Sequence, residues 1–216
     1  MNKKWQVYNV NEAQVEEIIN NNNVNKLIAT ILSNRGITNQ KDIDIFLNPT
    51  RQDFHNPYQM PDMEIAVERI IKAIENKEKI IIYGDYDVDG ITSITVLKSF
   101  LKDRGIDAKY YIPNRIEEGY GLNIPAVEKI AKEKYDLMIT VDCGISCIEE
   151  IRRANELGVQ TIVTDHHEPG DKLPNAIAVI DNKRKDSTYP FRELAGVGVV
   201  FKLIQALGIK LGLKEE

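Results

Sequence analysis

Residues 79–90 read Lys79-Ile80-Ile81-Ile82-Tyr83-Gly84-Asp85-Tyr86-Asp87-Val88-Asp89-Gly90. The apolar run over 79–83 is typical of a strand that is buried on both faces, as strands of parallel sheets are. Carboxylates follow at alternate positions, in a turn bounded by glycines. Because neighbouring carboxylates repel one another, this turn predicts a positively charged partner such as a metal ion.

Strands and helices alternate from this stretch onward. Further short apolar runs predict strands at 107–112, 136–141, 159–164 and 176–180. Helical spacing predicts a helix that Asp62 caps, and further helices at 90–104, 124–134, 146–157 and 197–213, of which the third has a capping box in Ser146 and Glu149. We therefore predict an α/β fold with a mostly parallel sheet of about five strands and helices on both faces.

The first sixty residues are expected to form a separate region. Apolar residues at helical spacing predict helices at 11–20, 24–34 and 38–47, and residues 50–60 have the irregular pattern of a connecting arm. The expected domains are therefore a helical amino-terminal region with its arm over 1–60 and the sheet domain over 61–216.

Composition limits the class of protein. The 216 residues include 28 Lys and Arg against 33 Asp and Glu, which gives a formal net charge of −5. This balance argues against a protein that coats nucleic acid by bulk charge, although it allows a local basic groove. The 2 cysteines are too few for a disulfide framework. A signal peptide and a long apolar run are both missing from the sequence, so we expect a cytoplasmic location.

Three predicted strand ends carry side chains that bind metals. Ligands of parallel sheets bind beyond the carboxyl ends of the strands. The residues that gather there are Asp85, Asp87, Asp89, Asp142, Asp165, His166 and His167. Carboxylate oxygens with one or two imidazoles suit Mn²⁺ or Mg²⁺ better than zinc.

Separate explanations exist for the individual motifs. Asp85 could open an EF-hand loop, but that loop needs a Glu at its twelfth position, where this sequence has Val96. The stretch 87–90 resembles the nucleophile motif of haloacid-dehalogenase-type phosphatases, a family that does not predict Asp-His-His at a later strand end. Asp142 could cap the helix at 146–157. His166 and His167 could be a polar pair in a loop. The joint placement of these residues at three strand ends favours a shared metal site over these separate explanations.

The motifs at 84–90, Asp142 and Asp165-His166-His167 resemble those of the DHH phosphoesterase superfamily, which is named after this last triplet. Three further stretches resemble the members that degrade single-stranded DNA from its 5′ end: 113–115 with 119–122, 189–191 with 194–199, and the amino-terminal region with Trp5. The resemblance implies a metal-dependent 5′→3′ exonuclease of DNA repair and recombination. It also implies single-stranded DNA with a 5′ end as substrate, no membrane, and single-strand-binding proteins or helicases as partners.

The resemblance implies roles for individual residues. The implied metal ligands, for two Mn²⁺ or Mg²⁺ ions with Asp142 between them, are Asp87, Asp89, Asp142 and His166. The implied catalytic residues are Asp85 and Asp165, which ligate or orient ligands, and His167, which lies near the scissile phosphate. The implied substrate-binding residues are Arg115, for phosphate, and Tyr120, for stacking on a base.

The sequence departs from the superfamily in two places. A fourth motif with a further metal-binding Asp, and the second domain that follows it, are expected in the full family, so we expect this chain to be an amino-terminal piece. Asn182-Lys183 stands where the family has Asn-Pro. Two alternatives stay open: a DHH-type phosphodiesterase for oligoribonucleotides or cyclic dinucleotides, and a non-catalytic module that binds metal or a partner.

Overall fold

The computed structural model describes residues 4, 7 and 9–213, so that Trp5 lies outside the described residues. The chain divides into two compact units, Met1–Phe54 and His55–Glu216. The division precedes the end of the expected arm because the last part of the arm packs on the second unit. There the hydroxyl of Tyr58 donates a hydrogen bond to the carbonyl of Ala206, over 3.0 Å.

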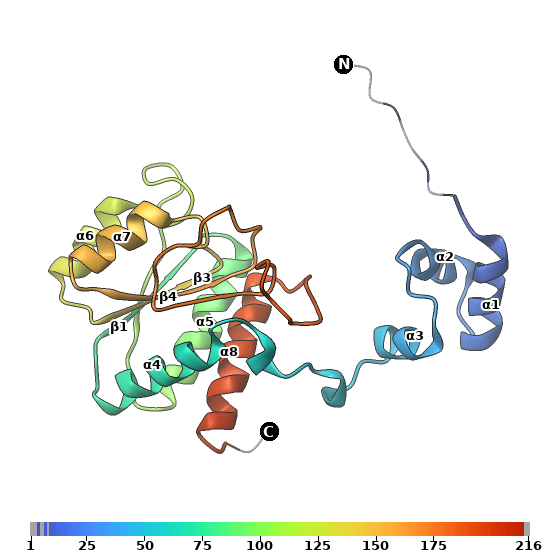
Figure 1. Cartoon of the computed structure of the whole chain (residues 1–216), viewed down its shortest axis with the longest axis horizontal. Coiled ribbons are helices and arrows are strands. Elements are labelled where there is room, and N and C mark those ends of the chain that lie inside the picture. The colour runs from blue at the N-terminus through green and yellow to red at the C-terminus, as the bar shows by residue number, and fades with distance from the viewer. Residues whose placement is uncertain (1–3, 5–6, 8, 214–216) are drawn as a thin grey trace. The chain divides into compact units, whose positions relative to one another are not determined.

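Three short helices build the amino-terminal unit, as the spacing predicts: α1 (Glu12–Asn22), α2 (Lys26–Asn34) and α3 (Gln40–Leu47) (Figure 1). Each helix follows an Asn whose side chain accepts a hydrogen bond from a backbone N–H of the first turn, which stabilises the helix start. The buried core of the unit is Val15, Ile18, Ala29, Leu32 and Ile43.

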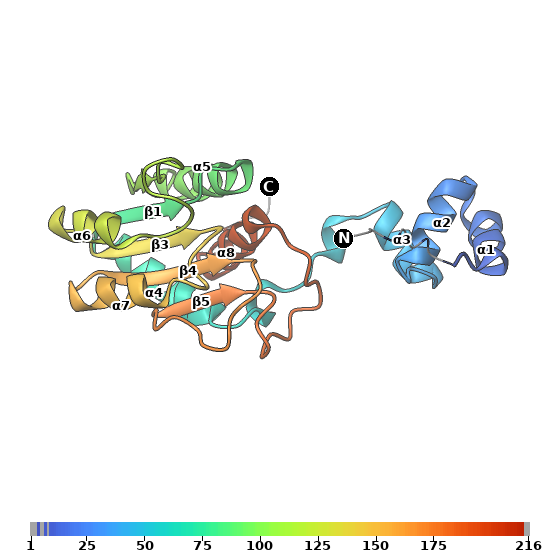
Figure 2. The same ribbon diagram turned by 90° about the horizontal axis from the view of Figure 1, so that it is seen from above.

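A parallel five-stranded sheet forms the centre of the second unit, which confirms the predicted fold class. Its strands are β1 (Ile80–Gly84), β2 (Lys109–Tyr111), β3 (Leu137–Val141), β4 (Gln160–Asp165) and β5 (Ala178–Asp181). The strand order is β2-β1-β3-β4-β5, and each neighbouring pair is parallel. The carboxyl ends of β1, β3 and β4 therefore lie side by side (Figure 2).

Helices cover both faces of this sheet (Figure 2). One face packs against α4 (Met63–Glu75), α5 (Val88–Lys102) and α8 (Gly196–Lys210), and the other against α6 (Ile124–Lys132) and α7 (Ile148–Glu156). Side chains alternate between the faces, so Ile80 and Ile82 join one core while Ile81 and Tyr83 join the other. Within the described ranges, every helix is too short or too polar to cross a bilayer.

Two helices next to the candidate site begin elsewhere than predicted. Helix α5 starts at Val88 rather than at residue 90, because the Asp87 carboxylate accepts a hydrogen bond from the Gly90 N–H over 2.9 Å and caps the helix. Helix α7 starts only after Cys147 and has no side-chain cap, so the predicted capping box is wrong. A turn, closed by the Cys147 N–H and the Gly144 carbonyl, occupies the positions before α7.

The predicted capping role of Asp62 is also wrong. Asp62 precedes α4, but its side chain makes no capping bond. One carboxylate oxygen instead accepts hydrogen bonds from the Val179 N–H, over 3.0 Å, and from the Arg184 guanidinium, over 2.6 Å. Arg184 is buried and pairs also with Asp186. Asp62 thus compensates a buried charge beside β5.

Replacing Asp62 with Ala is therefore expected to lower the free energy of unfolding by about 2 kcal/mol, because a buried guanidinium and a backbone N–H both lose an acceptor. Urea denaturation followed by circular dichroism measures the change. Asp171→Ala is the matched control, since that carboxylate is fully exposed and lies 3.7 Å from Lys185. Equal unfolding midpoints for the two variants would contradict this assignment.

Candidate metal centre

The carboxyl edge of the sheet brings together the side chains that the sequence predicts to bind metal or to act in catalysis. Asp85, Asp87 and Asp89 follow β1, Asp142 follows β3, and the Asp165–His167 triplet ends β4. The parallel register places these strand ends at one level, since Val141 pairs with both Gly84 and Thr164. The pairing of the strands thus brings the predicted residues to the same edge of the sheet.

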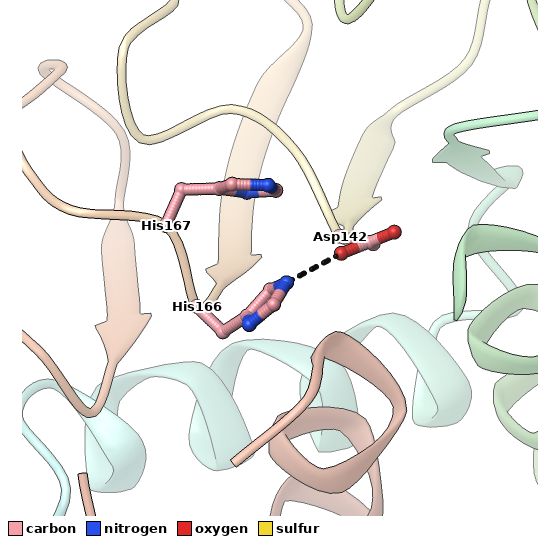
Figure 3. Close-up of side chains that lie close together, drawn as sticks. All are labelled: Asp142, His166 and His167. Carbon is pink, nitrogen blue, oxygen red and sulfur yellow. Dashed lines mark ion pairs between the residues drawn. The ribbon is translucent and has the colours of Figure 1, made fainter. Parts of the chain in front are cut away.

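Two groups of side chains are arranged as metal ligands, and they share Asp142. One consists of Asp142, His166 and His167, and the other of Asp85, Asp87 and Asp142. Within each group the ligand atoms lie within 4.8 Å of one another. Figure 3 shows the Asp142 carboxylate next to the His166 ring, at 3.1 Å from Oδ1 to Nε2. This is the arrangement expected of a carboxylate between two ions.

Two of these carboxylates are buried and only partly compensated by the protein, through His166 beside Asp142 and through the charges of His167 and Arg115 near Asp85. Asp142 is 2% exposed and Asp85 is 1% exposed. Both oxygens of Asp85, and Oδ1 of Asp142, lack a hydrogen-bond partner among the described residues. Burial, followed by the charges of Asp89 and Asp87, raises the pKa of Asp142 to about 8. Burial also raises the pKa of Asp85. Buried oxygens of this kind fit a divalent cation.

The amino terminus of α8 binds the Asp89 carboxylate. Its two oxygens accept hydrogen bonds from the Gly196 and Val197 N–H groups, each over 2.7 Å. The positive end of the helix dipole also lies at these N–H groups. A Cβ atom at position 196 would lie 2.5 Å from Oδ1 of Asp142, so only glycine allows so close an approach. Sequence analysis missed this contact, for which a glycine at the start of α8 was the available signal.

A second close approach explains the glycine that ends the motif after β1. A Cβ atom at Gly90 would lie 2.4 Å from the carbonyl oxygen of Asp85. Since a backbone atom cannot move aside as a side chain end can, the first turn of α5 can fold against the end of β1 only with glycine here. This packing places Asp87 and Asp89 at the start of the helix.

Asp165 orients His167. The carboxylate is 1% exposed and accepts hydrogen bonds from the N–H groups of Ile145, His166 and His167. His167 Nδ1 lies 2.7 Å from Oδ1 of Asp165. Burial raises the pKa of Asp165, but the hydrogen bonds from His167 and the backbone lower it further, and the net pKa is lowered. The hydrogen bond to Asp165 raises the pKa of His167. With Nδ1 held, Nε2 of His167 faces the candidate site.

The loop after β2 brings both predicted substrate-binding residues to this edge. The Tyr120 hydroxyl lies 3.2 Å from Nε2 of His167. The Arg115 guanidinium lies over the ring of Tyr86, at 5.4 Å from its centre. Sequence analysis did not single out Tyr86, because an aromatic residue between two carboxylates carries no pattern of its own.

The chain is similar in sequence to proteins of known family. A model of the DHH family, N-terminal domain, matches residues 79–216. The chain belongs to the DHH family. It is 42% identical over 204 residues to the single-stranded-DNA-specific exonuclease RecJ of Bacillus subtilis (strain 168), and the match covers 94% of this chain and 26% of the relative. The RecJ of Haemophilus influenzae is 38% identical, with 82% of this chain and 30% of the relative covered.

Solved structures of DHH relatives agree in fold. The crystal structure of RecJ from Thermus thermophilus in complex with Mn²⁺ gives a TM-score of 0.69 at 30% identity, over 94% of this chain and 28% of that one. A second exonuclease RecJ structure, bound to manganese, gives 0.67 at 37% identity, over 72% and 39%. These findings confirm the resemblance drawn from the motifs. The chain spans less than a third of the length of the two curated relatives named above.

The end of β5 contains the local departure from the DHH pattern and a carboxylate that sequence analysis missed. Asn182, which is buried, donates from Nδ2 to the Arg192 carbonyl over 2.6 Å and so stabilises the turn. Asp181 is buried and pairs in register with Asp165. Burial raises its pKa to about 7. It was missed because the predicted strand ended at Ile180.

Proposed function

We propose that this chain is the metal-binding part of an exonuclease that hydrolyses single-stranded DNA from its 5′ end. The observation that carries the proposal is the pair of ligand groups sharing Asp142, with Arg115 and Tyr120 beside them. The RecJ relatives, of which this chain matches a part, are named as single-stranded-DNA-specific exonucleases, which supports this substrate over other phosphodiesters.

The proposed cofactor is a pair of Mn²⁺ or Mg²⁺ ions. Hard carboxylate oxygens and imidazoles suit both metals, and the RecJ structures similar to this chain are described as holding manganese. The proposed ligands are Asp87, Asp89, Asp142 and His166, with Asp85 beside them. Divalent ions bound there would supply Lewis acidity, which activates water and neutralises charge on the phosphoryl oxygens.

The other residues of the site would bind and orient the substrate. The Arg115 guanidinium can donate parallel hydrogen bonds to phosphate oxygens. Asp165 holds the imidazole of His167 at Nδ1, and Nε2, which lies 3.2 Å from the Tyr120 hydroxyl, can donate a hydrogen bond to a phosphoryl oxygen of the substrate. Tyr120 is half-exposed and offers a ring for stacking on a base. The chain would thus position a terminal nucleotide against the ligand groups.

We place this activity in DNA repair and recombination in the cytoplasm, with single-strand-binding proteins and helicases as candidate partners. The RecJ relatives are named as single-stranded-DNA-specific exonucleases, an activity that DNA repair and recombination can use.

Replacing Asp89 with Ala is expected to lower Mn²⁺-dependent release of nucleotides from 5′-phosphorylated single-stranded DNA at least about 10³-fold, because a metal ligand is lost. The assay uses this chain and a chimaera that joins it to the remaining part of the Bacillus subtilis RecJ. The matched control is Asp103→Ala, at the exposed far end of the same helix.

Full activity of the Asp89 variant would refute the metal site. Cleavage of oligoribonucleotides or cyclic dinucleotides in preference to DNA would replace the proposed substrate by another of the DHH superfamily. Activity in the chimaera together with Mn²⁺ binding but no hydrolysis by the chain would assign the chain a binding role within the exonuclease.

A further inference from the structure

An unbroken series of side-chain contacts leads from the exposed loop after β2 to the metal centre. The Arg115 guanidinium lies over the Tyr86 ring, and the Tyr86 ring meets the edge of Tyr120 at 6.3 Å between centres and 87° between planes. Tyr120 in turn contacts His167, edge to face, at 6.1 Å. Tyr86 therefore touches both residues that sequence analysis assigned to substrate binding.

We propose that Tyr86 is a positioning residue that holds Arg115 at the metal centre, with the guanidinium edge presented to a phosphate of the terminal nucleotides. This inference rests on the proposed exonuclease function. Tyr86 has a fixed backbone, Arg115 is borne by an anchored loop, and the guanidinium lies over the Tyr86 ring.

The backbone at Tyr86 is fixed on both sides. The preceding residue, Asp85, is buried at the end of β1, and its carbonyl lies against Gly90. The following residue, Asp87, caps α5. The chain therefore has little freedom between these two points, which fixes the position from which the Tyr86 ring extends.

The loop that carries Arg115 is anchored at both ends. At one end the Glu118 carboxylate accepts hydrogen bonds from the Asn114 N–H, over 2.8 Å, and from the Tyr111 hydroxyl, over 2.6 Å. At the other end the buried Tyr83 hydroxyl donates to the Gly121 carbonyl over 2.9 Å. Arg115 lies between these anchors, and no carboxylate of the described residues forms an ion pair with it. Its guanidinium contacts the Tyr86 ring, and the charge of the neighbouring Asp85 attracts it toward the same turn.

A cation–π contact can leave the N–H groups of a guanidinium free for other partners. An arginine that lies on an aromatic ring uses its face, while its N–H groups remain available for a phosphate in bidentate geometry. The cation–π contact is worth about 0.5–1 kcal/mol at an exposed site. Loss of the ring would leave the charge in place but let it point away from the substrate.

The test is a double-mutant cycle on Tyr86 and Arg115. The probe is a fluorescent, 5′-phosphorylated single-stranded DNA of about ten nucleotides, and its affinity for the full 216-residue chain with Mn²⁺ is read by anisotropy. We expect Tyr86→Leu to weaken DNA binding about 2- to 5-fold. Tyr86→Phe, which keeps the aromatic ring, should bind the DNA as the wild type does. The double variant Tyr86→Leu/Arg115→Ala should bind as Arg115→Ala alone does. Tyr110→Leu, on the half-exposed Tyr of β2, is the control.

Mn²⁺ affinity, measured by calorimetry, should be the same in all these variants, a result that general damage to the turn would not give. Additive losses from Tyr86→Leu and Arg115→Ala, or a fall in Mn²⁺ affinity with Tyr86→Leu, would overturn the inference and leave the exonuclease proposal standing. A wild-type chain that binds Mn²⁺ but not the DNA would overturn the substrate assignment, and this role of Tyr86 with it.

Discussion

Replacing Asp142 with Asn is expected to abolish stabilisation of the chain by Mn²⁺, since both ligand groups lose their shared carboxylate. For the wild-type chain, a concentration of Mn²⁺ one hundred times its dissociation constant should add about 2.7 kcal/mol to the free energy of unfolding. The variant should gain almost nothing. Thermal unfolding with and without Mn²⁺ measures the difference.

The same substitution should change the pH dependence of the metal-free chain. Folding raises the pKa of Asp142 from its ordinary 3.8 to about 8, so the folded state holds a proton that the unfolded state releases. The contribution of Asp142 to the free energy of unfolding is therefore fully present at low pH and is lost as the pH rises toward 8. The loss is about 2 kcal/mol between pH 6 and 7.5. The raised pKa values of Asp181 and His167 act in the same direction. Asp142→Asn should remove the part due to Asp142.

Asp136→Asn is the matched control, since this exposed residue immediately precedes the opposite end of the same strand. It should keep both the response to Mn²⁺ and the pH dependence. An Asp142→Asn variant that is stabilised by Mn²⁺ as strongly as the wild type would exclude Asp142 as the shared ligand.

Gly196→Ala is expected to weaken Mn²⁺ binding at least about tenfold and to lower the free energy of unfolding by about 1–3 kcal/mol. The added methyl group would lie 2.5 Å from Oδ1 of Asp142 and 2.8 Å from its Cβ atom. Relief of this clash requires the first turn of α8 to move, which breaks the N–H bonds to Asp89. Calorimetric titration with Mn²⁺ and urea denaturation measure the two effects.

The control for this prediction is Gly208→Ala in the same helix. A Cβ atom there has its nearest neighbour, an atom of Leu213, at 4.0 Å. Alanine in a helix interior is more favourable than glycine by about 0.5–1 kcal/mol, so this variant should be slightly more stable and bind Mn²⁺ normally. Equal Mn²⁺ affinities for the two alanine variants would show that α8 does not need to approach Asp142 closely.

The sheet and most of the site residues were predictable from sequence for a simple reason. Buried parallel strands are short apolar runs, and Ile80–Gly84 and Leu137–Val141 show this pattern, in which Thr140 is the one polar side chain. Once the strands are placed, parallel pairing brings Asp85, Asp142 and Asp165 to one edge without further information. Local pattern and one rule of topology are sufficient for this part.

The remaining parts depend on contacts between distant segments. Asp62 does not cap its helix because Arg184, which needs a carboxylate, comes from far along the chain. Asp89 is bound by N–H groups that lie 107 and 108 residues later. A sequence pattern read within a window of one helix contains neither partner. Tyr86 was missed for the same reason, since its neighbours Arg115 and Tyr120 belong to another loop.

The contact between Asp89 and the start of α8 also affects how the domain assembles. A site that uses Asp89 in this position is complete only when the chain has been made and folded from β1 as far as Gly196. An ion that prefers the complete site would bind finished domains and leave partly folded ones alone. The fraction of molecules that bind Mn²⁺ in a titration would then equal the fraction in which α8 has packed against the sheet.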